Sequence, residues 1–266
     1  MRHSSIGLMA LLTAGPVHAQ LAAPNANGVS FAHVHISVTD LSLHETLWTD
    51  LFDGVLVKKA GYSAVRVPGV LIFFTEQEPT TTSVNTVIDH FGFRVRDVAE
   101  VLGKWQALGN DVDSQWTSAE GRPRAYITMP DGIRLELEEA PGLSTSTEMH
   151  HVHIYSPRYQ ELPEWYGGLF GATPTTRGGI QTTVDVPGAN LSFSDSREPR
   201  APSDGTSIDH IGFEVEDMDA FAALLRQEGI EVEFGPLYIE SLDLWVAFFT
   251  DPSGALVEAT QGLDKY

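Results

Sequence analysis

The sequence contains a motif that occurs twice, and this repeat constrains the fold more than any other feature. IDHFGFRVRD at residues 88–97 returns as IDHIGFEVED at residues 208–217. In each copy a histidine opens an alternation of apolar and polar residues that is typical of a half-buried strand, and an aspartate closes it. Looser copies begin near His33 and His151. The sequence therefore predicts one structural unit used four times.

Each of the four strands is followed by signals for a helix and then for further strands. Aspartates placed to cap helices end three of the first strands, namely Asp40, Asp97 and Asp217. Large apolar residues follow at helical spacing, and a glycine stands where each helix should end. Strand-like runs come next, such as VLIFFT at residues 70–75. We therefore predict that each unit is a strand, a helix and several strands.

Odd units resemble odd units and even units resemble even units at a nearly constant offset, which predicts a tandem duplication of a two-unit domain. The segment APGLSTSTEM at residues 140–149 is poor in large apolar residues and separates the two halves. The predicted organisation is a signal peptide at 1–19, a flexible lead-in at 20–30, an N-terminal domain at 31–140, a linker at 141–149 and a C-terminal domain at 150–262.

Composition excludes several classes of protein. With 266 residues, 42% of them hydrophobic, the chain can bury a sizeable core. The formal charge of −20 argues against nucleic acid and anionic membranes as partners, because the long-range field repels them. There is no cysteine, which excludes disulfides, zinc-thiolate sites and thiol nucleophiles.

The N-terminus has the pattern of a secretory signal. Arg2 gives a basic start, IGLMALLTAG supplies a short apolar run, and Val17-His18-Ala19 offers small residues at the expected cleavage spacing. The run is too short to span a bilayer, and no cysteine follows it that could carry a lipid anchor. We expect a mature chain that begins near Gln20 in a periplasm or outside the cell, with no membrane anchor.

These motifs resemble the vicinal oxygen chelate superfamily, which includes glyoxalase I, fosfomycin and bleomycin resistance proteins and extradiol dioxygenases. The resemblance covers residues 31–260 and rests on the four histidine-initiated strands, the helices that end in Leu-Phe before a glycine, and the turns at Pro130 and Pro252 that precede a Glu-bearing strand. It implies an α+β fold of four βαβββ units paired into two cup-shaped open barrels. The sequence does not determine the oligomeric state, and a homodimer is one possible assembly.

Side-chain alternation and the resemblance together predict the metal ligands. A ligand on the first strand of a unit points into the cup with its neighbours at i+2 and i+4, and the family places a glutamate on the strand after the proline turn. Each half is therefore expected to hold one ion, with Glu138 as the second choice for Glu136. The predicted ligand sets are His33, His90 and Glu136 in the N-terminal half, and His151, His210 and Glu258 in the C-terminal half.

Two imidazoles and a carboxylate suit Fe(II) with O₂ chemistry, and also Mn, Co, Ni or Zn as Lewis acids. A glyoxalase-type fourth ligand is not expected, because VLIFFT and NLSFSD contain no Glu or His. His35 and His153 stand at i+2 from predicted ligands and face the same cups, which makes them candidates for proton transfer. Tyr126 matches the tyrosine that extradiol enzymes place before the turn, whereas Phe248 occupies that position in the C-terminal half.

The resulting hypothesis is an exported, metal-dependent enzyme that acts on a small vicinal-oxygen substrate, with an Fe(II) extradiol-type dioxygenase as the favoured reading. One alternative is a redox-neutral, glyoxalase-like lyase or isomerase that uses Mn, Ni or Zn. Another is a non-catalytic binding or resistance protein. O₂ consumption distinguishes the first from the second, and dependence of ligand affinity on the predicted metal ligands distinguishes both from the third.

Overall fold

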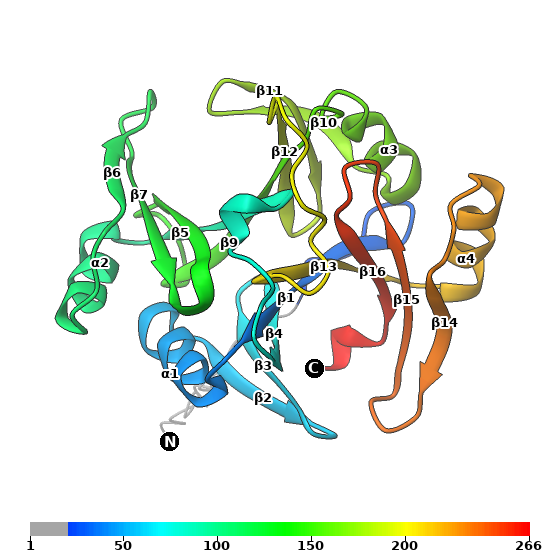
Figure 1. Ribbon diagram of the computed structural model, residues 1–266, viewed down its shortest axis with the longest axis horizontal. Coiled ribbons are helices and arrows are strands. Elements are labelled where there is room, and N and C mark those ends of the chain that lie inside the picture. The colour runs from blue at the N-terminus through cyan, green and yellow to red at the C-terminus, as the bar shows by residue number, and fades with distance from the viewer. Residues whose placement is uncertain (1–20) are drawn as a thin grey trace, which may run out of the picture.

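The computed structural model describes residues 21–266, which form four βαβββ units in an α+β fold, as predicted (Figure 1). The first unit contains β1 (Val29–Val38), α1 (Leu41–Phe52), β2 (Val55–Lys59), β3 (Tyr62–Val67) and β4 (Val70–Glu76). The second contains β5 (Ile88–Val95), α2 (Val98–Ala107), β6 (Ser114–Thr117), β7 (Pro123–Met129) and β8 (Ile133–Glu139). The third contains β9 (Thr147–Tyr155), α3 (Leu162–Phe170), β10 (Thr173–Arg177), β11 (Ile180–Val186) and β12 (Ala189–Ser194). The fourth contains β13 (Ile208–Val215), α4 (Met218–Gln227), β14 (Phe234–Ile239), β15 (Leu244–Thr250) and β16 (Leu256–Gln261).

The predicted helix caps are confirmed. The side chains of Asp40, Asp97 and Asp217 each accept a hydrogen bond from a backbone N–H in the first turn of α1, α2 and α4. Such a cap is typically worth about 1 kcal/mol. Helix α3 ends at Gly171, which adopts a left-handed conformation with φ 63°. Local sequence signals therefore fix where three of the four units turn from strand to helix.

The pairing of units into sheets differs from the prediction. One sheet has the order β14-β15-β16-β13-β1-β4-β3-β2 and joins the first unit to the fourth, whereas the other has the order β10-β11-β12-β9-β5-β8-β7-β6 and joins the second to the third. The predicted cup within each half is therefore wrong, since both cups draw one unit from each half. The antiparallel pairs β1/β13 and β5/β9 form the junctions between the halves.

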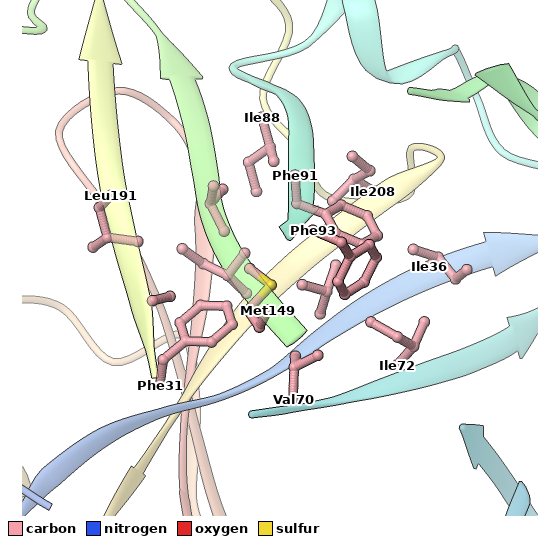
Figure 2. Packing of buried hydrophobic residues seen from close by; sticks show 14 of the residues in the cluster. Phe31, Ile36, Val70, Ile72, Ile88, Phe91, Phe93, Met149, Leu191 and Ile208 are labelled. Atoms are coloured by element: carbon pink, nitrogen blue, oxygen red, sulfur yellow. The ribbon is translucent and has the colours of Figure 1, made fainter. Parts of the chain in front are cut away.

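The two units of each half are held together by apolar packing instead of strand pairing. Trp48 of α1 stacks on Phe91 of β5 with ring centroids 5.9 Å apart, and Phe170 of α3 stacks on Phe213 of β13 at 4.0 Å. Residues from both sheets meet in one buried cluster (Figure 2). Among them are Phe31 of β1, Ile72 of β4 and Phe93 of β5. Sheet pairing and core packing alternate, so the four units form a closed ring.

The predicted linker and the predicted lead-in both make contacts with the four units. Strand β9 begins at Thr147, so the last residues of the predicted linker 141–149 belong to the sheet. In the lead-in, Asn25 Nδ2 donates to the carbonyl of Phe170 at 2.8 Å, which attaches this segment to α3 of the other half. The predicted signal peptide, residues 1–19, lies outside the described residues. Between residues 21 and 266, no helix has both the length and the apolar character needed to cross a membrane.

Because each sheet contains strands from both halves, neither half should fold alone into a native monomer. We expect separately produced fragments 21–140 and 141–266 to lack a cooperative thermal transition as monomers, and to gain one when mixed as a 1:1 complex. Circular dichroism and analytical ultracentrifugation would measure both effects. A monomeric fragment with a cooperative transition of its own would contradict the sheet pairing described above.

Candidate metal centres

Two groups of buried histidine and glutamate side chains lie at the junctions between the halves. The first consists of His33 from β1, His210 from β13 and Glu258 from β16, and the ligand atoms of its members lie within 4.8 Å of one another. Nε2 of His33 and Nε2 of His210 are 2.9 and 3.0 Å from the same oxygen, Oε2 of Glu258. We call this group the first triad.

The second triad has the same construction from the other pair of units. It consists of His90 from β5, Glu136 from β8 and His151 from β9, again with ligand atoms within 4.8 Å of one another. Nε2 of His90 and Nε2 of His151 lie 3.3 and 3.4 Å from Oε2 of Glu136. All three side chains are at most 3% exposed.

The structure brings together all six predicted ligands, but in exchanged combinations. The expected sets His33–His90–Glu136 and His151–His210–Glu258 are wrong, because His33 belongs with His210 and Glu258, and His151 with His90 and Glu136. The physical reason is the sheet pairing, which places the first strand of each odd unit against the first strand of an even unit from the other half. Each candidate site therefore depends on both halves of the chain.

The glycine of each IDHxGF motif makes room for a ligand from the partner strand. His33 pairs with Gly212 across β1/β13, and Glu258 pairs with the same glycine across β13/β16. A Cβ on Gly212 would lie 1.8 Å from Cε1 of His33, and one on Gly92 would lie 2.3 Å from Cε1 of His151. Only glycine at these positions lets the histidine and the glutamate on either side approach each other.

The aspartate of each motif fixes the orientation of the following histidine. Asp89 Oδ1 lies 2.6 Å from Nδ1 of His90, and Asp209 Oδ1 lies 2.5 Å from Nδ1 of His210. Neighbouring residues in a regular strand point to opposite faces, but the strand register shifts at both aspartates, between Ile88 and His90 and between Ile208 and His210. With Nδ1–H bonded to a carboxylate, Nε2 of each ring is free for a metal. These aspartates were not identified from the sequence.

His150 is a further residue that strict alternation along a strand would misplace. In a regular strand it would point away from His151, but the register shift between β5 and β9 places it in a bulge, and its Nδ1 lies 3.3 Å from Nδ1 of His151. Glu138, the second choice for a ligand, lies outside the triad and contacts Arg122 at 3.0 Å and also Arg124. The first choice, Glu136, is the member of the group.

Burial and charge shift the titration of the first triad in opposite directions. Burial lowers the pKa of His33, although Glu258 opposes the shift. Burial would also lower the pKa of His210, but hydrogen bonds to Asp209 and Glu258 raise it to about 9. The two imidazoles hold the pKa of the Glu258 carboxyl well below its usual value despite its burial. Glu258 is thus an anion at neutral pH, as a metal ligand must be.

The donor sets fit a divalent cation. Oxygen and imidazole ligands in a two-His, one-carboxylate set are typical of Fe(II) and also suit Mn, Co, Ni and Zn. In the second triad, Nε2 of His90 and Nε2 of His151 are buried and make no hydrogen bond with any part of residues 21–266. A buried ring nitrogen without a partner is costly, and a metal ion at the centre of the triad would satisfy both.

The candidate proton-transfer residues divide between the two sites. The ring of His35 lies 4.6 Å from that of His210, and its Nε2 is 2.7 Å from the Thr75 hydroxyl. His153 has the matching position beside His90, with its Nε2 2.8 Å from the Ser194 hydroxyl. Tyr126 lies at the second triad, where its hydroxyl donates to Oε2 of Glu136 at 3.1 Å. The alternation rule is therefore correct for both histidines.

The surroundings of the two triads differ. The first triad opens into a cavity of about 350 Å³ whose walls are mostly aliphatic and aromatic, with Phe73, Phe248 and Tyr266 among them. At the second triad, Arg124 Nη1 and Arg177 Nη1 lie 3.4 and 3.7 Å from Oε1 of Glu136. The first triad therefore faces an apolar cavity, whereas the second triad has guanidinium groups directly beside its glutamate.

Comparisons with known proteins agree with this architecture. Residues 148–259 match the model of the Glyoxalase/Bleomycin resistance protein/Dioxygenase superfamily. Glyoxalase I from Zea mays superposes with a TM-score of 0.67 at 15% identity, covering 89% of this chain and 94% of that one. A putative dioxygenase from Bacillus subtilis subsp. subtilis str. 168 gives 0.65 at 13% identity, covering 91% and 86%. No curated protein sequence matches the chain.

The fold and the paired triads are similar to those expected of the vicinal oxygen chelate superfamily, and the family model covers the C-terminal part of the chain. The predicted resemblance to that superfamily is confirmed by the family match and by the fold. At such low identity the superposed structures establish the fold alone.

A methyl group at Gly212 should disable the first triad, since the His33 ring would have to move. We expect Gly212→Ala to weaken metal binding at that triad by about tenfold or more, as loss of a supporting contact does, and to destabilise the protein by about 1–3 kcal/mol. Gly103→Ala is the matched control. Its Cβ meets nothing within 4 Å in helix α2, so it should stabilise by about 0.5–1 kcal/mol. Elemental analysis after dialysis and urea unfolding would measure these effects. Unchanged metal content in Gly212→Ala would contradict the assigned role of the glycine.

Proposed function

We propose that this protein is a metal-dependent enzyme whose reaction takes place at the first triad, on a small vicinal-oxygen substrate with an apolar body. The observation that carries the proposal is the cavity of about 350 Å³ that leads to His33, His210 and Glu258. Ligand sites are typically apolar cavities of this size with a few convergent polar groups. Phe73, Phe234 and Phe248 supply aromatic wall, which favours an aromatic substrate.

The favoured reaction is an Fe(II)-dependent, extradiol-type oxygenation. Two imidazoles and a carboxylate with open positions are the ligand set of non-haem Fe(II) oxygenases, in which the iron supplies the O₂ chemistry. The residues of the chain would bind and orient the substrate around that set. Asp209 holds the proton on Nδ1 of His210 and so keeps Nε2 directed at Glu258.

His35 is the group best placed to take a proton from a substrate hydroxyl at this site. It lines the same cavity, and its ring lies 4.6 Å from that of His210. Burial, with the neighbouring His210 and His33, lowers the pKa of His35 to about 3. The ring is therefore neutral at pH 7, and the Thr75 hydroxyl contacts its Nε2.

A redox-neutral lyase or isomerase reaction with Mn, Ni or Zn is the second candidate. The observation that favours it is Phe248, whose ring lies 5.2 Å from that of His210 and has no hydroxyl. Extradiol enzymes are expected, from the resemblance, to carry a tyrosine there. In this alternative the metal acts as a Lewis acid, and His35 again moves the proton.

Iron content and O₂ uptake test the favoured reaction. The protein purified without added metal should contain iron and consume O₂ with members of a panel of catechols and hydroxyquinols. His210→Ala should reduce uptake by more than about 100-fold, since loss of a ligand exceeds the 10–100-fold cost of losing a supporting partner. His151→Ala, the matched change at the second triad, should retain it.

Two outcomes would assign the protein to another class. An iron-loaded protein that never consumes O₂, together with activity that survives strict anaerobiosis with Mn or Ni, would favour the redox-neutral reaction. Affinity for the panel compounds that is unchanged by His33→Ala and His210→Ala would point to a non-catalytic binding protein.

We also propose that the chain is exported to a periplasm or the cell exterior. The support is the sequence of residues 1–19, with its basic start, short apolar run and Val17-His18-Ala19. Fractionation followed by N-terminal sequencing should find a mature chain that begins at Gln20. Ala19→Asp should block cleavage and leave a longer chain, because the cleavage site requires a small residue. A wild-type chain that stays in the cytoplasm and begins at Met1 would contradict the proposal.

A further inference from the structure

The second triad is surrounded by arginines in a protein that is otherwise strongly acidic. The chain has 16 basic side chains and a net charge of −20. Six of these basic side chains lie within 4 Å of a carboxylate oxygen of Asp89, Glu136 or Glu138: Arg94, Arg122, Arg124, Arg134, Arg177 and Arg200. Six guanidinium groups thus face three carboxylates, which leaves an excess of positive charge. Glu148, 3.7 Å from Arg94, neutralises only part of this excess.

The first triad has no such surplus. Within residues 21–266 the ion-pair partners of Asp209 and Glu258 are the histidines His33 and His210 alone. A divalent cation there would be balanced by two carboxylates. The same cation at the second triad would add to a local charge that is already positive, although its ligand set is the same.

Two of the arginines lie directly against the triad. Arg124 and Arg177 share Oε1 of Glu136, while the two histidines and the Tyr126 hydroxyl face Oε2. The Nε of Arg124 is buried and has no hydrogen-bond partner in residues 21–266. A donor is therefore available beside the carboxylate that a metal would use.

A cavity reaches this cluster from one side. It has a volume of about 490 Å³, and its lining includes Arg177 and Asn190, together with His150, whose Nδ1 contacts that of His151. Arg94, Glu148 and Asp185 also line it, so its own charges nearly balance. A small ligand in this cavity would meet the Arg177 guanidinium beside the triad.

We propose that the second triad binds a divalent cation only together with a small oxyanion or carboxylate ligand, which Arg124 and Arg177 hold. A cation alone, bound at Oε2 of Glu136, would bring its charge next to the two buried guanidinium groups that share Oε1 of the same carboxylate, at a cost that uncompensated buried charges do not sustain. An anion would accept further hydrogen bonds from the arginines, including the unpartnered Nε of Arg124, and would compensate the cation. Because the coupling is reciprocal, the anion tightens cation binding and the cation tightens anion binding.

This inference concerns the second triad and is independent of the reaction proposed at the first. The two sites of one chain would then take different ligands: an apolar vicinal-oxygen compound at the first triad and an anion at the second. The probe for the test is Mn²⁺ with sulfate as the anion, compared with chloride at the same ionic strength.

The experiment uses the full-length mature protein with His33→Ala and His210→Ala, so that only the second triad can bind. Free Mn²⁺ is followed by electron paramagnetic resonance during titration. We expect the affinity for Mn²⁺ to be at least tenfold higher in sulfate than in chloride. Equal affinity in both salts would overturn the proposal, and so would no binding in either, which would mean that the arginines stand permanently in place of the cation.

Substitutions at Arg177 test the mechanism of the coupling. In the same background, Arg177→Met should raise the affinity for Mn²⁺ in chloride and reduce the effect of sulfate to less than about twofold, because the repulsion and the anion partner are both removed. Arg177→Lys keeps the positive charge and should keep most of the sulfate effect. If it does, the loss of the effect in Arg177→Met is due to the missing charge and not to misfolding. Arg226→Met, an exposed site on α4, is the control and should behave like its parent. A full sulfate effect in Arg177→Met would contradict the assigned role.

Discussion

The close approach of one histidine ring to a glycine on the neighbouring strand is the constraint on which the rest of the structure depends. His33 over Gly212 and His151 over Gly92 join the two halves of the chain at the centre of each sheet. The missing Cβ lets a histidine from one half and a glutamate from the other reach the same point. Any larger residue would push the ring away and separate the ligands, so the motif that defines the repeat also defines the site.

The closed ring of units would couple folding to the binding of an ion at either candidate site. Units pair through strands at the junctions between halves and through apolar packing within each half, as at Trp48 on Phe91 and Phe170 on Phe213. Each triad takes ligands from both halves, so an ion would bind the assembled state and not an unfolded chain. Such binding stabilises the folded protein by mass action. Both candidate sites therefore lie at the strand junctions that join the two halves of the chain.

The two triads illustrate how one scaffold can support different chemistry. Their ligands, glycines and supporting aspartates correspond position by position, yet Phe248 stands at the first triad where Tyr126 stands at the second. The wall of the first is apolar, and arginines from β7 and β10 fill the second. Since the residues that differ surround the ligands and do not replace them, a shared fold does not imply a shared ligand.

The sequence by itself determined the βαβββ unit, its caps and the identity of all six candidate ligands, because these follow from local periodicity and from a motif repeated along the chain. It could not determine which ligands share a site, since alternation within a strand carries no information about which strand lies next to it. Asp89, Asp209 and His150 were missed for a related reason: register shifts in the paired strands turn their side chains in directions that a regular strand forbids. Arg124 and Arg177, which both contact Glu136, are distant from each other in sequence, and only the sheet that contains both β7 and β10 brings them together. Local chemistry was thus fixed by the order of residues, and the partners of each group by long-range strand pairing.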